Sequence, residues 1–521
     1  MAKLGSSEDV PVTQALLVTV LKVLRQYPLI TILWLIILRF LVRRYLSPLR
    51  KYPGPFIASG TRLWAAYSTY LGHTEQDYIA LHNRYGPVVR NKPNQLSFSS
   101  PEAARQILSP GKGFHKTDFY WVFPPYGNPD IFTEVSEAKH AILKKFAGPA
   151  YSLASFQALT PCIEDTEQLL CAKLDALAGS STTPIVDLGA WLHYFAFDVL
   201  GRVAFSSSFG FLEQGRDIDD SIAFIDEVQT YDGLIGQIPW LDYILRRAPY
   251  WDYLPFVKPI GNNVMTRTAL GEMNARQEGK TKPEGRDLME QLLEAHAKDP
   301  EKFTTGNVFA IAHGAIFAGS DSTASTMQTF CHSVFSNPQI YKRLTQEILA
   351  ADKQGQLSDM ITWDESQRHL PYFQACLKET MRTGPAVGLN ISRKVPLSGA
   401  EIDGTFVPGG VEVAVNAHVL HLNTDIFGAD ADKFRPERWL VKEGDDNDET
   451  RVKRMERYMF QFGGGSHVCI GRNLAILEMS KILPQILRRY KFELAYPGRP
   501  MKKHSSFFVV QQGLEVKFER R

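Results

Sequence analysis

The residues best suited to chemistry in this sequence surround one cysteine, Cys469, near the end of a glycine-rich run. The segment is Phe462-Gly-Gly-Gly-Ser-His-Val-Cys-Ile-Gly471, and a helical pattern of apolar residues begins at Arg472. Glycines remove side-chain bulk, so the backbone of this loop can approach a large flat ligand. Free N–H groups of the loop and of the first helical turn can donate to sulfur, and the helix dipole favours thiolate over thiol. We therefore predict that Cys469 is a thiolate ligand of haem iron.

Two other interpretations of this segment are weaker. Most protein cysteines are small, buried and inert, but the glycines and the following helix set Cys469 apart. A glycine loop that cradles phosphate needs Lys-Ser or Lys-Thr after its glycines, and neither follows here. The remaining cysteines are widely spaced and form no C-x-x-C pair, which argues against a disulfide framework or a structural zinc site: Cys162, Cys171, Cys331 and Cys376.

With Cys469 at its centre, the segment resembles the haem-binding signature F-x-x-G-x-R-x-C-x-G of the cytochromes P-450. Phe462, Gly465, Cys469 and Gly471 match the signature. His467 stands where the family usually has an arginine that pairs with a haem propionate, and its charge is titratable. The Gly-Gly-Gly-Ser-His variant is most similar to fungal microsomal members of the pisatin demethylase-like group.

A second motif, Ala318-Gly-Ser-Asp-Ser-Thr323, lies in the middle of a long helical pattern over Phe303–Ser336. It resembles the A/G-G-x-D/E-T motif of the family's central helix, which crosses the haem face opposite the thiolate. The resemblance implies that Asp321 and the hydroxyl of Ser322 or Thr323 relay protons for dioxygen activation. Serine lacks the methyl group that restrains the usual threonine. The alternative is that Ser322 only bonds the carbonyl one turn back.

A third set of residues, within Glu379-Thr-Met-Arg382 and Phe434-Arg-Pro-Glu-Arg-Trp439, follows in the order that the resemblance implies. Glu379 and Arg382 share a helix face, so their side chains can pair. Taken alone, this is a common surface pair. In similar proteins the corresponding residues form a buried triad, here Glu379, Arg382 and Arg438, and a bidentate arginine suits that structural role.

Haem propionates are anionic and need basic partners. The family's helix pattern W/H-x-x-x-R is matched by His140-Ala-Ile-Leu-Lys144, where lysine keeps the charge but not the planar fork of arginine. Arg393 resembles the arginine that begins a strand beside the haem. The resemblance therefore implies that Arg393, His140, Lys144 and His467 bind the propionates, with an ordinary surface lysine as the alternative for Lys144.

The aromatic-rich segment 114–132 is similar to the loop that roofs the substrate pocket in related enzymes, although local packing would give the same composition. By family position, the expected pocket residues are Phe119, Tyr120, Phe317, Ala318, Ala386, Val387 and Phe507. Their apolar character favours a lipophilic substrate. His418 and His421 lack the glutamate and the spacing of the zinc motif H-E-x-x-H, so both are expected to be structural.

Helical periodicity dominates the elements that must position these residues. Apolar residues at three- and four-residue spacing predict helices over 102–108, 138–147, 188–205, 303–336, 341–351, 372–383 and 472–489. Strand patterns are short and cover 88–90, 401–402, 410–415 and 515–518. Strands and helices do not alternate regularly, which argues against a doubly wound sheet. We expect a mainly α protein with a small β subdomain, the cytochrome P-450 fold, preceded by one N-terminal membrane-anchor helix.

The most apolar stretch, 16–42, is long enough for a bilayer span of about 20 residues. Basic residues follow it and favour the cytoplasmic side. We expect a lumenal tail (1–15), a transmembrane anchor (16–42), a basic and proline-rich hinge (43–56) and a catalytic domain (57–521). The expected location is the endoplasmic reticulum membrane, single-pass, with the catalytic domain facing the cytoplasm. A signal peptide fits the basic flank less well, and an amphipathic helix in the membrane interface stays open.

The chain has 521 residues, 44% of them hydrophobic, and a net charge of +2. This composition is that of a packed globular protein, and it gives no reason to expect a nucleic-acid partner. The resemblance implies a monooxygenase with thiolate-ligated haem b that inserts one oxygen atom of dioxygen into a lipophilic small molecule, by hydroxylation, epoxidation or oxidative demethylation, in fungal secondary metabolism. NADPH would supply electrons through NADPH–cytochrome P-450 reductase, with cytochrome b5 as a further candidate partner. A reductase-independent haem-thiolate isomerase or dehydratase and a non-catalytic haem-binding sensor remain alternatives.

Overall fold

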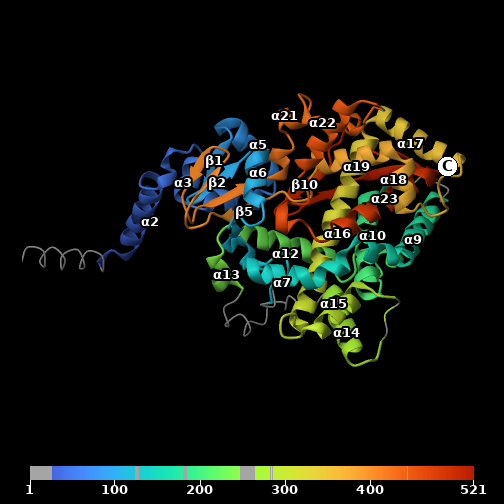
Figure 1. The fold of residues 1–521 in the computed structure, drawn as a ribbon, viewed down its shortest axis with the longest axis horizontal. Coiled ribbons are helices and arrows are strands. Elements are labelled where there is room, and N and C mark those ends of the chain that lie inside the picture. Colours follow the sequence, from blue (N-terminus) through green and yellow to red (C-terminus); the bar gives the residue numbers. More distant parts are fainter. Residues whose placement is uncertain are drawn as a thin grey trace, which may run out of the picture.

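The structure, a computed structural model, describes residues 26–123, 128–179, 185–246, 264–281, 283, 285–442 and 444–521. Helices make up most of the body, and the strands β1, β2 and β5 lie toward the end from which the N-terminal helix projects (Figure 1). The mainly α architecture with a small β part is therefore confirmed.

The helices before the centre of the chain begin and end as follows: α2 Pro28–Tyr45, α3 Phe56–Gly60, α4 Leu63–Leu71, α5 Thr74–Tyr85, α6 Pro101–Leu108, α7 Glu137–Ala147, α8 Leu153–Ala158, α9 Thr160–Ala178, α10 Leu188–Phe205, α11 Phe211–Gln214, α12 Ser221–Ile235, α13 Trp240–Leu245 and α14 Val264–Gln277. The later helices are α15 Leu288–Lys298, α16 Thr305–Phe335, α17 Pro338–Lys353, α18 Trp363–His369, α19 Pro371–Thr383, α20 Ala417–Leu420, α21 Thr424–Phe427, α22 Asp446–Arg457 and α23 Arg472–Arg489. All seven predicted helices are present, and α10 and α23 have the predicted bounds.

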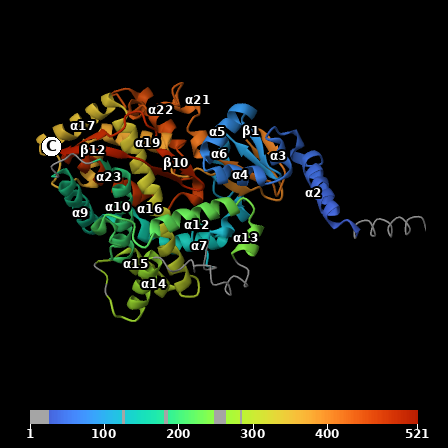
Figure 2. The same ribbon diagram turned by 180° about the vertical axis from the view of Figure 1, so that it is seen from behind.

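The long helix α16 forms the spine of the largest hydrophobic core. Its N-terminus is fixed by a capping box, in which Thr304 and Asn307 bond each other's backbone N–H groups. Helices α10, α15, α19 and α23 pack against it, and the two opposite views show α10 and α12 beside it (Figures 1 and 2). Burial on so many sides explains why its sequence is apolar around most of its circumference.

The main sheet has the strand order β1-β2-β8-β5-β3. Its strands are β1 Val88–Lys92, β2 Gln95–Phe98, β3 His115–Lys116, β5 Ile391–Lys394 and β8 Glu412–Val415. Strands β2 and β8 pair in parallel, and the other neighbours are antiparallel. The register places Lys116 opposite Arg393. This pairing brings two cations, far apart in the sequence, to the same place in the fold.

Three smaller sheets complete the β part. They contain β4 Val186–Asp187, β12 Glu515–Arg520 and β9 Tyr490–Leu494; β10 Lys502–Ser505 and β11 Val509–Gln512; and β6 Ala400–Ile402 and β7 Thr405–Val407. The four predicted strand segments are all found, and so is the strand that the resemblance implied at Arg393, β5. The strands that were not predicted are β2, β3, β4, β7, β9, β10 and β11, because segments of two to five residues carry too little periodicity to identify a strand.

Helix α2 leaves the body beside α3 (Figure 1). Most of its apolar side chains are exposed, and its last turn also contacts β1, where Arg90 bonds the Arg43 carbonyl oxygen. In the described part of the chain, no helix combines the length and apolar character needed to cross a bilayer. The predicted tail, 1–15, and the first part of the predicted anchor, 16–42, lie outside the described residues.

The predicted hinge, 43–56, is hydrogen-bonded to β1, the edge strand of the main sheet. The guanidinium of Arg90, on β1, donates to the carbonyl oxygen of Arg43 at 2.8 Å, and its backbone N–H donates to that of Pro53 at 2.7 Å. A Cβ atom at Gly54 would stand 2.1 Å from the Arg90 carbonyl oxygen, so only glycine allows this approach. The Pro-Gly-Pro segment is therefore a bend that packs directly against β1.

Candidate active site

The loop around Cys469 is shaped by glycine. A Cβ atom at Gly465, where φ is +62°, would stand 1.8 Å from the Leu108 carbonyl oxygen, so the loop lies directly against the end of α6. The backbone N–H of Cys469 donates to the Phe462 carbonyl at 2.8 Å, and α23 begins three residues later. Phe462, Gly465, Cys469 and Gly471 thus form one cradle, as the sequence motif predicts.

The sulfur of Cys469 faces an interior cavity. Burial raises the pKa of this thiol, while backbone N–H bonds from Gly471 and Arg472 lower it in part. The N–H groups of the first helical turn therefore point at sulfur as expected, and they favour the anionic form that an iron ligand requires. A metal cation at the sulfur would supply the remaining stabilisation of the thiolate.

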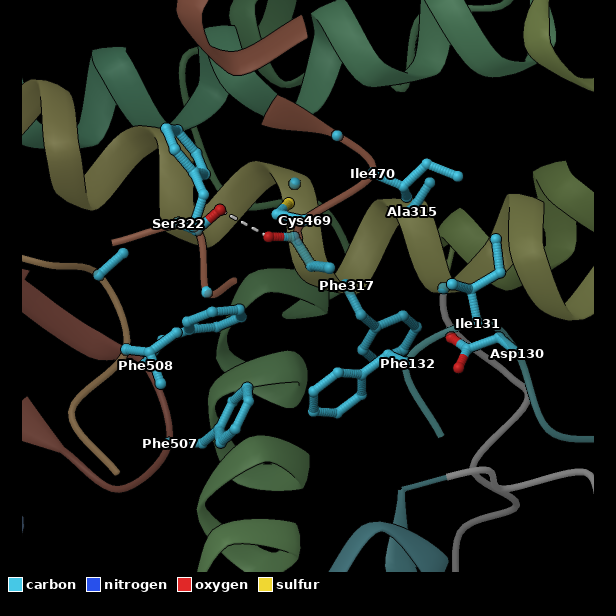
Figure 3. Close-up of a pocket in the computed structure, with 18 of the residues that line it drawn as sticks. Asp130, Ile131, Phe132, Ala315, Phe317, Ser322, Cys469, Ile470, Phe507 and Phe508 are labelled. Atoms are coloured by element: carbon cyan, nitrogen blue, oxygen red, sulfur yellow. Dashed lines mark hydrogen bonds between the residues drawn. The ribbon is translucent and has the colours of Figure 1, made fainter. Parts of the chain in front are cut away.

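The cavity has a volume of about 400 Å³ and reaches from the Cys469 loop to the face of α16. All of the predicted pocket residues line it: Phe119, Tyr120, Phe317, Ala318, Ala386, Val387 and Phe507. Phe132 and Phe508 join Phe507 in an aromatic group, with ring centroids 5.6 and 4.9 Å from that of Phe507 (Figure 3). The wall opposite the thiol is therefore mostly apolar and aromatic.

Basic side chains converge on one edge of this cavity. Arg393 is buried and donates to the Tyr120 hydroxyl at 3.0 Å, and the rings of His140 and His467 lie 4.1 Å apart. Burial and the nearby cations lower the pKa of Lys116 to about 7 and that of His140 to about 4. Since these cations repel one another, the edge is suited to an anionic group.

Glu137, His140 and His467 also bring three possible metal-ligand atoms within 4.8 Å of one another. Two of these atoms already bond each other, because His467 Nε2 lies 2.9 Å from a Glu137 carboxylate oxygen. Burial, together with the charges of Arg393 and Lys116, lowers the pKa of both histidines, and these same charges also oppose a metal cation here. An anion fits this cluster better.

Of the predicted propionate partners, Arg393, His140 and His467 line the cavity, whereas the ammonium of Lys144 donates to the Ser466 carbonyl at 2.5 Å. Lys116 also lines the cavity, and sequence reasoning missed it. Nothing in its local sequence marks it, because only the pairing of β3 with β5 brings it to the site.

The predicted relay residues of α16 divide between two faces. Ser322 and Thr323 line the cavity, and the Ser322 hydroxyl donates to the Ala318 carbonyl at 2.7 Å (Figure 3), which is the bond considered as the alternative role of this serine. The Asp321 carboxylate instead contacts α10 and α12: its Oδ1 lies 2.7 Å from His193 Nε2, and its Oδ2 accepts a hydrogen bond from the Gln229 amide. Neither partner was predicted.

The structure brings the predicted triad together in the core. Arg382 forms two bonds to the Glu379 carboxylate, at 2.7 and 2.9 Å, and the Arg438 Nε donates to the same carboxylate at 2.9 Å. The indole N–H of Trp439 adds a bond at 2.8 Å, which sequence reasoning did not anticipate. All of these side chains are buried, so the arrangement differs from a solvated surface pair.

His418 and His421 do not form a metal site. The Nδ1 atom of His421 bonds the Arg382 carbonyl at 2.9 Å, and its Nε2 atom accepts the backbone N–H of Phe460 at 2.9 Å. His421 therefore ties α19 to the segment that leads into the Cys469 loop, and its structural role is confirmed.

A glycine-cradled cysteine below a long central helix, with a cationic edge and an apolar roof, defines a haem-thiolate protein. The sequence matches the family Cytochrome P450 over residues 52–518, and the chain belongs to this family. It is thus an enzyme of an oxygenase family whose members hold haem through a cysteine thiolate and use dioxygen.

Fungal proteins are among the most similar curated relatives. The cytochrome P450 monooxygenase cicH of Emericella nidulans is 34% identical over 92% of this chain and 95% of its own length. A cytochrome P450 monooxygenase of Aspergillus terreus is 35% identical over 86% of this chain and 91% of its own. Pisatin demethylase of Fusarium vanettenii is 31% identical, over 91% of each chain. The resemblance to fungal members related to pisatin demethylase is confirmed.

The residues present fit haem. Cys469 offers a sulfur with N–H donors behind it, Arg393 and Lys116 bring positive charge to the cavity edge, and the ring nitrogens of His140 and His467 can donate to two propionates. When bound, the haem supplies the redox chemistry that activates dioxygen. The protein supplies the thiolate, the charge balance and a cavity on the far side in which a substrate is held.

Proposed function

We propose that this protein is a haem-thiolate monooxygenase that inserts one oxygen atom of dioxygen into a lipophilic small molecule of fungal secondary metabolism. The observation that carries this proposal is the aromatic-walled cavity that joins the Cys469 sulfur to the Ser322–Thr323 face of α16. The relatives' names support it, because cicH and the Aspergillus terreus protein are both named monooxygenases. Pisatin demethylase adds oxidative demethylation as one candidate outcome.

The reaction balances with one substrate C–H bond, one dioxygen molecule, two electrons and two protons. One oxygen atom enters the C–H bond as a hydroxyl group, and the other leaves as water with both protons. The electrons come from NADPH, one at a time, through NADPH–cytochrome P-450 reductase, with cytochrome b5 as a second donor. Phe119, Phe507 and their aromatic neighbours hold the substrate and exclude water, which favours productive use of the electrons.

Protons are the part of this balance that the chain itself must control. Asp321 supplies protons from the α10–α12 side of α16, and Ser322 and Thr323 carry hydroxyls on the cavity side. Ser322 can serve when its hydroxyl leaves the Ala318 carbonyl, since hydroxyl rotors reorient easily. Thr323 is the second candidate, because it lines the same cavity.

The proposed function is tested by turnover. Purified protein with NADPH, a fungal reductase and a panel of lipophilic candidate substrates is expected to consume dioxygen and to form products that carry one atom of ¹⁸O from ¹⁸O₂. Product formation without dioxygen or NADPH would instead indicate the haem-thiolate isomerase or dehydratase. Tight haem binding with no substrate-dependent NADPH oxidation would indicate the sensor.

Replacing Asp321 by asparagine is expected to lower product formation by about a hundredfold, at the lower end of what positioned acid–base groups contribute. NADPH oxidation should fall less than product formation, so the product formed per NADPH consumed drops. Asp219→Asn is the matched control, because Asp219 forms an exposed ion pair with Arg267 at 2.6 Å. Retention of both rate and coupling in Asp321→Asn would refute the role of Asp321 in proton supply.

We also propose that α2 and the segment before it attach the protein to the endoplasmic reticulum membrane, with the catalytic domain on the cytoplasmic side. The exposed apolar side chains of α2 and the basic residues Arg43 and Arg44 in its last turn support this location. A variant without residues 1–50 is expected to move largely to the soluble fraction after cell lysis. Full retention in the membrane pellet, at equal haem content, would contradict the proposal.

A further inference from the structure

An ion pair joins α16 to α10, and its partner on α10 is a residue to which the motif of the central helix assigns no role. His193, on α10, places Nε2 2.7 Å from Asp321 Oδ1. The side chain of Asp321 is only 3% exposed, whereas that of His193 is 16% exposed. His193 therefore bonds a fully buried carboxylate while its own side chain stays partly exposed.

Helix α12 completes the surroundings of Asp321. The amide of Gln229 donates to Asp321 Oδ2, and Gln229 itself lines the cavity. Asp226 lies three residues earlier on α12, on the same helix face as Gln229. Its Oδ1 atom is buried and has no hydrogen-bond partner among the described residues. A buried carboxylate oxygen without a hydrogen-bond donor is costly, and protonation of the carboxyl group lowers that cost.

The charges facing His193 all have one sign. Burial by itself lowers the pKa of His193, but the hydrogen bond and charge of Asp321, together with the charges of Asp226 and Asp217, raise it overall. Burial and the nearby Asp321 carboxylate raise the pKa of Asp226. His193 and Asp226, whose pKa values are both raised, therefore form a pair of titratable groups beside Asp321 that can exchange a proton with it.

We propose that His193 positions Asp321 and resupplies it with protons from solvent. The proton on His193 Nε2 moves to Asp321 Oδ1, Asp321 passes one on toward the cavity side of α16, and the partly exposed side chain of His193 regains one from water. No electrons move in these steps, and each proton that leaves solvent is one of the two that the reaction consumes. The inference rests on the proposed monooxygenase function, which creates the demand for protons.

The two roles of His193 are separated by comparing His193→Gln with His193→Ala. Glutamine places an N–H donor near the position of Nε2, so it can hold Asp321, but it does not titrate. Alanine removes both roles. His73→Gln is the matched control, because His73, which precedes α5, forms a surface pair at 3.1 Å with Asp77 in the first turn of that helix.

We expect His193→Gln to lower product formation by about tenfold, less than Asp321→Asn because water can still reprotonate Asp321 slowly. In the unaltered enzyme, the rate is full below the raised pKa of His193 and falls as pH rises through it. That alkaline fall should be absent in His193→Gln. A glutamine variant with the original rate, coupling and pH profile would show that His193 is only structural, and would overturn the proposal.

A measurement without turnover tests the pairing itself. The sample is the full-length haem protein, reduced and saturated with carbon monoxide and labelled with ¹³C at histidine. NMR spectra recorded over a range of pH follow the titration of His193, whose signal is identified by its absence in His193→Gln. Its pKa should drop in Asp321→Asn, since the raising partner is lost. An unchanged pKa would overturn the proposal. Absence of any product in the unaltered enzyme would defeat the proposed function instead, while the titration would still report on the pair.

Discussion

Cys469→Ala is expected to abolish the long-wavelength absorption that thiolate-ligated haem shows in its reduced carbon monoxide complex. Product formation should fall below detection with it. The reason is that the cradle around residue 469 provides a sulfur and backbone N–H groups, and alanine leaves no atom that could donate electron density to iron. The measurement is the reduced carbon monoxide difference spectrum, together with the haem content of the purified protein.

Cys162→Ala is the appropriate control, because Cys162 is partly buried on α9 and lies far in sequence from the cradle. It should leave the spectrum unchanged. If Cys469→Ala kept the thiolate band, another side chain would have to hold the iron, and the assignment of the cradle would be wrong.

Glu379→Ala is expected to be the most destabilising single change in the chain's buried charge network. The Glu379 carboxylate accepts bonds from Arg382, Arg438 and Trp439, and removing it leaves two buried guanidinium groups without this partner. Breaking a buried ion pair from one side costs about 3–5 kcal/mol of unfolding free energy. Guanidinium-induced unfolding, followed by fluorescence and by haem release, measures the loss.

Glu456→Ala controls for the loss of a surface charge pair, since Glu456 pairs with Lys378 where both side chains are 40% or more exposed. Such a pair contributes about 0–1 kcal/mol. Equal destabilisation by Glu379→Ala and Glu456→Ala would mean that the triad has no special role in the fold.

Local sequence patterns predicted the elements whose signal is contained in their own residues. The bounds of α10 and α23 follow from apolar spacing, and the Cys469 cradle follows from glycines followed by a helix. The predicted pocket residues required the family resemblance, because their apolar side chains are equally suited to a packed core. Placing them around one cavity is the contribution of the fold.

Apart from the triad, which the family resemblance implied, pairings between distant residues could not be predicted. Lys116 reaches the cavity edge through strand pairing with Arg393. Its strand has only two residues, which is too short for a sequence pattern to predict it. His193 and Asp321 are 128 residues apart, so their contact follows only from the packing of α10 against α16. The position of Asp321 was thus predicted, but the direction in which its carboxylate points was not.

Arg90 bonds the carbonyl oxygens of Arg43 and Pro53, so the chain between these two residues is held against β1 at both of its ends. β1 is the first strand of the sheet whose far strands carry Arg393 and Lys116. A continuous set of hydrogen bonds, through Arg90 and the strands of this sheet, therefore connects the end of the first helix with the edge of the cofactor cavity.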